Sequence, residues 1–455
     1  MKTEKQQGHM TDMTRGDSLK VIIRFALPLV AAAVIQQLFS LTDAMVLGIF
    51  SGDRGLAVLG VCSWPVWFQV SVLTNFGQAS CLLTAVRFGA KNEKNLKKAI
   101  GNVYFASFLL GLVMVPGLLA SAGTLLSIQN TPPEVFDDAL SYLKILYIGT
   151  VFLLVYNTLS SLLRALGDSY TSFLAITVSA LVNVVMDVIL VAGFGMGVRG
   201  AAIATTASQV LAALICLVKI SRYPVFHVSR KYLRPDGLLL KEYIGICIPM
   251  MAQSIVIAVG GTFVQSHINQ YGTVFAAGIS AAGKIFSVVE TGAIALASAS
   301  ASFVSQNVGA RQFERIRTVV KQVCGLSEAT AVVIAIVLLV LGKYILSFYV
   351  TDEAVVYAMG NLKVYSAGLL LMYPMYALRQ TVQALGNVRI PLLAAVLQLV
   401  MRILTASFLP LLIGSSGIYY TSFAAWAVSL ILIGFVYPVQ FRKCMENSRG
   451  GGNSW

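Results

Sequence analysis

The sequence Arg164-Ala165-Leu166-Gly167-Asp168 decides the fold, because it occurs a second time, about 220 residues later, as Gln383-Ala384-Leu385-Gly386-Asn387. Three further pairs keep nearly the same spacing: Phe88–Lys91 with Val308–Arg311, Ala26–Pro28 with Cys247–Pro249, and Gly197–Val198 with Gly417–Ile418. The chain is therefore predicted to contain two copies of one structural unit.

The composition places both copies in a membrane. Hydrophobic residues make up 57% of the chain and charged residues 11%, whereas charged residues make up about 25% of an average soluble domain. Uncharged stretches such as Leu56–Val86 exceed the roughly 20 helical residues that cross a hydrocarbon layer of about 30 Å. A chain this apolar must expose its helices to lipid and satisfy their backbone groups internally.

Twelve membrane-spanning helices are predicted, six in each copy. Their approximate bounds are 20–48, 56–86, 97–122, 138–164, 169–194, 200–220, 242–268, 274–305, 316–345, 356–380, 389–413 and 417–440. Six spans return the chain to its starting side, so the second copy enters the membrane with the orientation of the first. The fold class is thus an all-α polytopic membrane protein, with two six-helix lobes related by a pseudo-two-fold axis along the membrane normal, as in many transporters.

The predicted domains follow from these spans. They are a cytoplasmic tail at 1–17, an N-lobe at 18–222, a cytoplasmic linker at 223–240, a C-lobe at 241–442 and a cytoplasmic tail at 443–455. The first twenty residues are polar and lack the apolar stretch of a cleaved signal peptide.

The distribution of charge predicts how the chain is oriented. The net charge is +14, but Lys and Arg concentrate in every second loop, as in Arg87–Lys98 and Arg222–Lys241. The alternate loops hold mainly Arg54, Arg199 and Lys343. This positive-inside pattern argues against nucleic acid as the partner and predicts a plasma (inner) membrane protein with both termini in the cytoplasm.

The six cysteines predict neither a metal centre nor a disulfide framework. They form no Cys-x-x-Cys pair and mostly lie within apolar runs. Small apolar packing is therefore the favoured interpretation. No organic cofactor is expected from any motif.

Two carboxylates within the spans are the strongest candidates for chemistry. Asp43 is the only charged residue between Arg24 and Asp53, and Asp187 has Asn183 one turn earlier on the same helix face. Because an ionised carboxylate at mid-bilayer costs about 2.5–3.5 kcal/mol on insertion scales, such residues usually serve an ion or proton pathway. The alternative is that each carboxylate pairs with another side chain and holds helices together without an ion or proton role.

Other polar residues near these acids join the N-lobe candidates. Asn157 adds an amide in the fourth span, directly before the span that carries Asp187. Gln36 and Gln37 lie about two turns before Asp43. An ion role and simple helix bridging are equally compatible with Asn157, and the two glutamines are candidate substrate-cavity residues.

The second copy does not repeat the acids. Asp43 corresponds to about Val264, Asp187 to about Ala406, and Asn183 to a position close to Arg402. Coupling chemistry is therefore expected in the N-terminal half only.

The C-lobe has its own charged and aromatic candidates for a substrate cavity. Lys284 and Glu290 lie in the eighth span and Arg402 in the eleventh. A Glu290–Arg402 ion pair and a substrate contact are alternative interpretations, and Lys284 could snorkel or line the cavity. Tyr373 and Tyr376 could line a cavity for flat cations, although helix packing would also explain them.

Taken together, these motifs resemble the multidrug and toxic compound extrusion (MATE) transporters of the MOP flippase superfamily. The resemblance covers about residues 18–442 and rests on Ala26–Gly48, Arg164–Asp168 and the run from Asn183 to Thr205. It implies twelve helices in two lobes, with export of organic cations or other drugs in exchange for H⁺ or Na⁺. It also implies a single monomeric chain in the bilayer.

The same resemblance implies one cation site in the N-lobe. Its members would be Asp43, Asn157, Asn183, Asp187 and Thr205. The first four would be the ligands if the coupling ion is Na⁺.

The chain departs from the branch that carries acids in the seventh and tenth spans. Its seventh span has Gln253 and Gln265 but no carboxylate, and its tenth has Arg379 and no acid. Coupling through C-lobe acids is therefore not expected.

Four other functions are alternatives to an antiporter. A flippase for lipid-linked or amphipathic substrates would need a cavity for an anionic headgroup. Lys284 and Arg402 are compatible with such a cavity, so this alternative stays open. An intramembrane aspartyl protease would carry a Gly-x-Gly-Asp signature, which is absent. A passive channel or a receptor would not require a two-lobe repeat. The sequence therefore predicts a cation-coupled transporter and not an enzyme.

Overall fold

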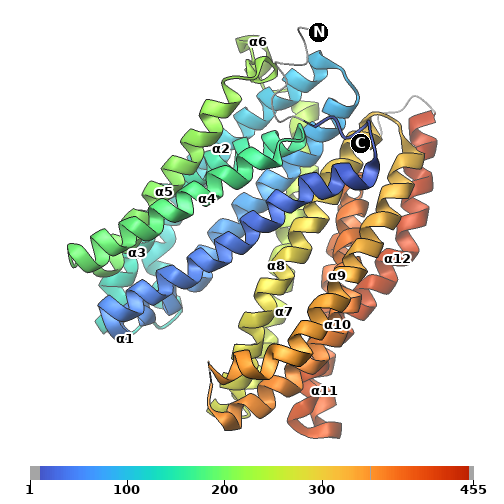
Figure 1. The fold of residues 1–455 in the computed structure, drawn as a ribbon. Helices are drawn as coiled ribbons and strands as arrows, with labels where there is room; N and C mark the ends of the chain where they lie inside the picture. The colour runs from blue at the N-terminus through green and yellow to red at the C-terminus, as the bar shows by residue number, and fades with distance from the viewer. Residues whose placement is uncertain (1–10, 349, 450–455) are drawn as a thin grey trace. The chain divides into compact units, whose positions relative to one another are not determined.

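The computed structural model describes residues 11–348 and 350–449, and within these residues it contains helices and no strands (Figure 1). The helices of the first copy are α1 Ser18–Gly89, α2 Glu93–Ile128, α3 Pro133–Ala165, α4 Ser169–Asp187, η1 Val188–Gly193 and α5 Gly197–Ile220. The connecting segment holds η2 Pro224–Phe226 and α6 Arg230–Leu233. The second copy comprises α7 Gly237–Asn269, α8 Thr273–Gly309, α9 Phe313–Ser347, α10 Asp352–Ala384, α11 Arg389–Ile413, η3 Gly414–Tyr419 and α12 Tyr420–Arg449.

The twelve predicted spans are confirmed within the described residues. The first two merge into α1, where Gly52 (φ 59°, ψ −156°) interrupts the helical backbone and separates them. Two segments, Ser18–Gly89 and Arg389–Ser448, are each long enough to hold two spans, and eight further apolar segments hold one each. Glycine tolerates this positive φ without steric penalty, so the chain can leave the helical conformation at this single residue between the two spans.

The chain divides into two compact units, which are described separately. The N-unit consists of residues 27–247 with Thr11 and Asp12, and the C-unit consists of Met13–Ala26 with residues 248–449. The division thus falls inside α7, and the first residues of α1 group with the C-unit. Parts of the predicted tails, residues 1–10 and 450–455, lie outside the described residues.

The repeated motif adopts the same turn in both units. Gly167 and Gly386 have φ values of 87° and 89°. The next residue caps the following helix in each case, because the Asp168 and Asn387 side chains accept hydrogen bonds from the backbone N–H three residues later, at 2.9 and 3.2 Å. The sequence repeat is therefore a structural repeat, with a left-handed glycine followed by an N-cap.

A second matched pair has the same unusual backbone. Lys91 and Arg311, at the repeated Gly-Ala-Lys/Arg motif, have φ values of 55° and 58°. Only a few per cent of non-glycine residues adopt this region. The shared conformation ends α1 and α8 in the same way, so the two units use matched turns as well as matched helices.

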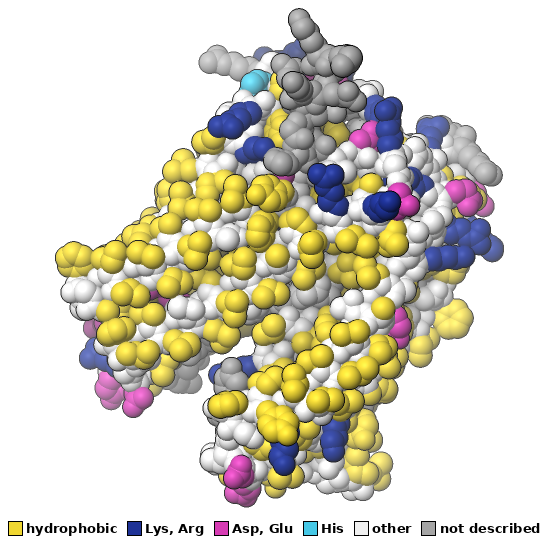
Figure 2. All heavy atoms as spheres, viewed as in Figure 1, with side chains coloured by type: hydrophobic (Ala, Val, Ile, Leu, Met, Phe, Trp, Pro, Cys, Tyr) yellow, Lys and Arg dark blue, Asp and Glu magenta, His cyan; other side chains and the backbone are white. Residues whose placement is uncertain are grey.

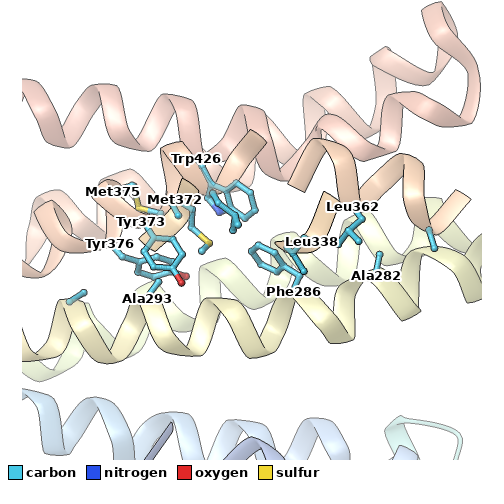
Figure 3. Packing of buried hydrophobic residues seen from close by; sticks show 14 of the residues in the cluster. Ala282, Phe286, Ala293, Leu338, Leu362, Met372, Tyr373, Met375, Tyr376 and Trp426 are labelled. Atoms are coloured by element: carbon cyan, nitrogen blue, oxygen red, sulfur yellow. The ribbon is translucent and has the colours of Figure 1, made fainter. Parts of the chain in front are cut away.

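Each unit has its own apolar core and an apolar outer surface. In the C-unit, Phe286 stacks on Trp426 with ring centroids 5.2 Å apart, among the buried residues of α8, α9, α10 and α12 (Figure 3). In the N-unit, Leu47, Leu143 and Tyr147 are fully buried. Side chains such as Phe108 remain exposed, and Figure 2 shows hydrophobic side chains along the N-unit helices. This pattern is expected of helices packed on one side and facing lipid on the other.

The ends of the N-unit differ in charge. Arg87 pairs with Glu242 (2.7 Å), and Lys98 pairs with Asp236 of the linker. Arg54, 33 residues before Arg87 on α1, lies about 50 Å away along the helix and pairs with Asp138 (2.8 Å). Figure 2 shows Lys and Arg side chains at the end that carries α6. The predicted charge asymmetry therefore corresponds to opposite ends of the helices.

Candidate functional site

The two predicted carboxylates meet inside the N-unit. Asp43 comes from the first half of α1 and Asp187 is the last residue of α4, and their side chains lie within hydrogen-bonding reach of each other. Asp187 is fully buried, while Asp43 is half-buried. A hydrogen bond between two carboxyl groups requires a proton on one of them, so the two side chains can bond directly only when one of them is protonated.

No protein donor neutralises this pair within the described residues. Both carboxyl oxygens of Asp187 and Oδ1 of Asp43 are buried there without a hydrogen-bond donor. Two ionised carboxylates in such a position would repel each other in a low dielectric. A proton or a monovalent cation would relieve that repulsion.

The backbone changes its helical form at Asp187. The α-helical hydrogen bonding of α4 ends at this residue, and Val188–Gly193 continue as a π-helix. The Phe194 N–H donates to the Ile189 carbonyl at 2.9 Å, which spans five residues. π-Helical turns are rare and occur frequently at functional sites. Asp187 therefore lies at a specialised point of the fold.

Asn183 and Thr205 form the second layer of the site. The Asn183 Nδ2 donates to Thr205 Oγ1 at 3.4 Å, and the fully buried Asn183 Oδ1 has no donor partner in the described part of the chain. Since Asn183 lies one turn before Asp187, its free amide oxygen lies on the helix face of the carboxylate. Carboxylate and amide oxygens are donors that suit hard cations.

The donor set is too small for a typical divalent metal centre. The described residues contain no group of three or more His, Cys, Asp or Glu side chains that could hold a metal ion. The carboxylate, amide and hydroxyl oxygens of this site can accept a proton or bind a hard cation, and H⁺ or Na⁺ as the coupling ion stays a prediction. The residues predicted for Na⁺ therefore retain suitable chemistry at Asp43, Asn183 and Asp187.

Asn157 is placed less directly than predicted. Its Nδ2 donates to the Leu153 carbonyl of its own helix at 2.9 Å. The side chain is half-buried, and this local hydrogen bond uses one of the two N–H donors of its amide. Its part in a cation site stays a prediction.

Tyr142 is a site residue that the sequence did not single out. This buried tyrosine of α3 lies within electrostatic reach of both Asp43 and Asp187. Its phenol can donate or accept a hydrogen bond. No local pattern marks it, because only the packing of α3 in the N-unit brings it to the acids.

An ion pair between Glu290 and Arg402, one of the two interpretations of these residues, is not found among the described residues. Glu290 accepts a hydrogen bond from the Tyr376 hydroxyl at 2.6 Å, and Arg402 donates to the Ile257 carbonyl at 3.2 Å. Arg379 lies over the Tyr376 ring, 4.2 Å from its centre. Glu290 thus bonds to a side chain of α10 and Arg402 to the backbone of α7.

The other candidate cavity residues divide into three groups. Tyr373 and Tyr376 are buried in the C-unit core (Figure 3), where Tyr373 also donates to the Val289 carbonyl at 3.2 Å. This placement favours packing over a cavity wall. Gln36 is exposed and Gln37 half-buried on α1, and their role stays a prediction. Lys284 and Arg402 line a cavity described below.

Comparison with known families supports the internal repeat. The profile of the MatE family matches residues 28–189 and 249–408. The two matched segments correspond to the two units, and together they cover more than half of the chain.

Proteins of similar sequence span nearly the whole chain. "Probable multidrug resistance protein YoeA" of Bacillus subtilis (strain 168) is 27% identical over 92% of this chain and 93% of that protein. "Multidrug export protein MepA" of Staphylococcus aureus (strain N315) is 24% identical over 94% of this chain and 96% of that protein. A crystal structure of MATE in the bent conformation has a TM-score of 0.89 and 19% identity, and covers 98% of this chain and 99% of that one. This last similarity concerns the fold.

Proposed function

Because the chain belongs to the MATE family of multidrug and toxic compound extrusion transporters, we propose that it exports organic cations and other drugs across the plasma membrane in exchange for H⁺ or Na⁺. The observation that carries the proposal is the meeting of Asp43 and Asp187 without a neutralising donor in the described residues. The names of the relatives YoeA and MepA support drugs as the substrate class.

The proposed mechanism uses the charge of the acid pair. A cation that enters between Asp43 and Asp187 removes their repulsion and the penalty of burying two charges. The site can therefore favour one conformation when no cation is bound and another when the cation is bound. Antiport follows if cation binding and drug binding favour opposite conformations, since each ligand can shift the equilibrium only by its differential affinity.

Bending of α1 is the proposed link between the site and drug release. Pro28 lies within α1, about four turns before Asp43, and proline removes one backbone hydrogen bond and kinks a helix. A change of charge at Asp43 can therefore alter the packing of a helix that already lacks a backbone hydrogen bond at Pro28.

The proposed orientation places the basic end of the N-unit in the cytoplasm. Lys98 lies at this end, where it pairs with Asp236 of the linker, and Arg87 pairs there with Glu242 of α7. Cytoplasmic loops of membrane proteins carry an excess of Lys and Arg. Both termini are then cytoplasmic, and we propose that the chain functions as a monomer.

Transport by purified protein tests the proposal. Full-length protein is reconstituted into proteoliposomes, and efflux of a fluorescent organic cation is measured under an imposed Na⁺ or H⁺ gradient. Wild type should export along one gradient, and Asp43→Asn should abolish this coupling at equal expression. Asp53→Asn, which changes an exposed acid of the same helix, is the matched control and should export normally. Undiminished coupled export by Asp43→Asn would contradict the mechanism.

One observation favours a second function, the flipping of an amphipathic or lipid-linked substrate. Lys284 and Arg402 line the same cavity of the C-unit, where an anionic headgroup could bind. Export that follows neither gradient, together with transfer of a lipid-linked substrate between leaflets, would favour this alternative over antiport.

A further inference from the structure

A polar cavity lies within the C-unit, and nothing in the proposed coupling mechanism uses it. This C-unit pocket has a volume of about 480 Å³ and is formed by residues of α7, α8, α10, α11 and α12. Its polar walls include Lys284, Arg402, Gln265, Tyr365, Ser280 and Ser422. Volumes of about 300–1,000 Å³ are typical of sites for drug-sized ligands.

The charges of the pocket are of one sign. Lys284 and Arg402 line it, and no Asp or Glu is among its lining residues. Neither cation forms an ion pair in the part of the chain that the structure describes. Glu290, six residues after Lys284, is engaged by Tyr376. The pocket therefore presents two positive charges that the protein does not balance with an ion pair in these residues.

Arg402 donates one hydrogen bond within the described residues, but its Nε has no acceptor there. One terminal nitrogen donates to the Ile257 carbonyl at 3.2 Å, and Nε is buried without an acceptor among the described residues. A Cβ at Gly260 would lie 3.2 Å from the Arg402 Cδ, so the glycine lets the side chain pack closely on α7. A buried charged donor without an acceptor is unfavourable. An oxyanion would supply the missing acceptor, and guanidinium binds such groups well.

The position of the pocket in the repeat strengthens this argument. Val264, which corresponds to Asp43, is one of its lining residues, and Arg402 lies close to the position that corresponds to Asn183. The region of the C-unit that matches the acid pair of the N-unit therefore carries cations. The polarity of the two matched regions is reversed.

We propose that the C-unit pocket binds the oxyanion group of a drug-sized amphipathic molecule, with the anion held between Arg402 and Lys284. Hydroxyl and amide groups of the walls, such as Tyr365 and Gln265, would supply further hydrogen bonds. The inference goes beyond the proposed function, because cation coupling at Asp43 does not require it.

Equilibrium binding tests the proposal without any transport. Full-length protein in phosphatidylcholine nanodiscs is titrated with dansylglycine, a fluorescent carboxylate, and with its methyl ester, which has nearly the same shape but no charge. The acid should bind at least about tenfold more tightly than the ester, because a charged hydrogen bond contributes enough for such a difference. Equal binding of the two probes, or no binding of the acid, would overturn the proposal.

Three variants locate the site. Arg402→Gln and Lys284→Gln should each weaken dansylglycine binding at least about tenfold. Val264→Asp should weaken it similarly by placing a carboxylate beside the cations, and it keeps the test decisive if Arg402→Gln fails to fold. Lys343→Gln changes an exposed cation of the C-unit outside the pocket and should bind as wild type does. Unchanged binding in all three pocket variants would overturn the assignment.

Competition distinguishes the source of the anion and separates this inference from the coupling proposal. Displacement of dansylglycine by dioctanoyl phosphatidic acid would assign a lipid headgroup to the pocket, and failure to displace it would assign soluble carboxylates. Asp43→Asn should leave dansylglycine affinity unchanged. If that variant binds dansylglycine and also transports normally, the coupling mechanism is contradicted and the anion site is still supported.

Discussion

The two units share a backbone and differ in the charge of their interiors. Gly167 and Gly386 take the same left-handed conformation, and each precedes an N-cap. At other matched positions, Asp43 is replaced by Val264, and the residue near Asn183 is Arg402. Turns and caps are constrained by backbone geometry, whereas an interior polar residue can change if its surroundings allow it. A duplicated fold can thus carry two different sites.

The helices that bear these residues differ too. α4 ends at Asp187 and continues as a π-helix, whereas α11 remains α-helical from Arg389 to Ile413. Among the described residues, a π-helical segment occurs only in the unit that carries the acid pair, whereas α11 is followed by the 3₁₀-helix η3. Irregular backbone at membrane depth usually lines a cavity or lies buried in protein, which agrees with a functional role for this segment.

The strongest change in transport is expected from the loss of one acid of the N-unit pair. Asp187→Asn keeps the shape of the side chain but removes the second acid, so gradient-driven efflux from proteoliposomes should fall about 100-fold, equivalent to about 2.7 kcal/mol. The C-unit should be unaffected, and dansylglycine binding provides the control for folding. Coupled efflux within a factor of two of wild type would show that Asp187 is structural.

The next effect concerns the repeated turn. Gly167→Ala would strain a residue at φ 87° and bring a Cβ against the Thr11 backbone, with which it overlaps. The left-handed conformation alone costs about 1–2 kcal/mol for alanine, and overpacking adds about 1–3 kcal/mol. Thermal unfolding in detergent should show a clear loss of stability.

Gly386→Ala is the matched variant in the C-unit. Its φ of 89° predicts the conformational cost of about 1–2 kcal/mol. If both glycine variants kept wild-type melting temperatures, the turn would not require glycine in either unit.

A smaller effect tests the charge arrangement of the C-unit. Tyr376→Phe removes the 2.6 Å hydrogen bond to Glu290 and should destabilise the protein by about 1–3 kcal/mol, because a partly buried carboxylate loses its donor. The melting temperature is the measurement, and Tyr420→Phe, which changes an exposed tyrosine, is the control. Cation-driven efflux should persist in both variants, since coupling is assigned to the N-unit. Loss of coupling in Tyr376→Phe would contradict the assignment of coupling to the N-unit alone.

The smallest effect concerns the linker, which is anchored to the N-unit. The hydrogen bond from Lys98 lowers the pKa of Asp236 below its ordinary value of 3.8. The stability from this ionised carboxylate is therefore present above about pH 4 and is lost as the pH falls through the lowered folded-state pKa. In Lys98→Gln the pKa should return towards 3.8, so linker proteolysis by pepsin should increase at a higher pH than in wild type. Identical pH profiles would show that the pair does not anchor the linker.

The sequence predicted most of the fold because its signals are local and repeated. Apolar length gave the spans, and the repeated motif at Gly167 gave the two-unit organisation. It also identified Asp43 and Asp187, since an acid in an apolar span is unusual wherever the helices pack. It left an ion pair and a substrate contact as alternatives for Glu290 and Arg402, because charge complementarity does not specify which side chains meet.

The number of spans, the duplication and the charges within the membrane could all be predicted from the amino-acid order alone. These properties depend on hydropathy, spacing and residue type, which no packing can alter. Tertiary structure decided which charges meet. It brought Asp187 to Asp43 and Tyr142 to both, and it placed Lys284 and Arg402 on one cavity. The reason is physical: side chains from different helices come together only through the rotation and depth at which those helices pack, and many weak contacts set that packing jointly.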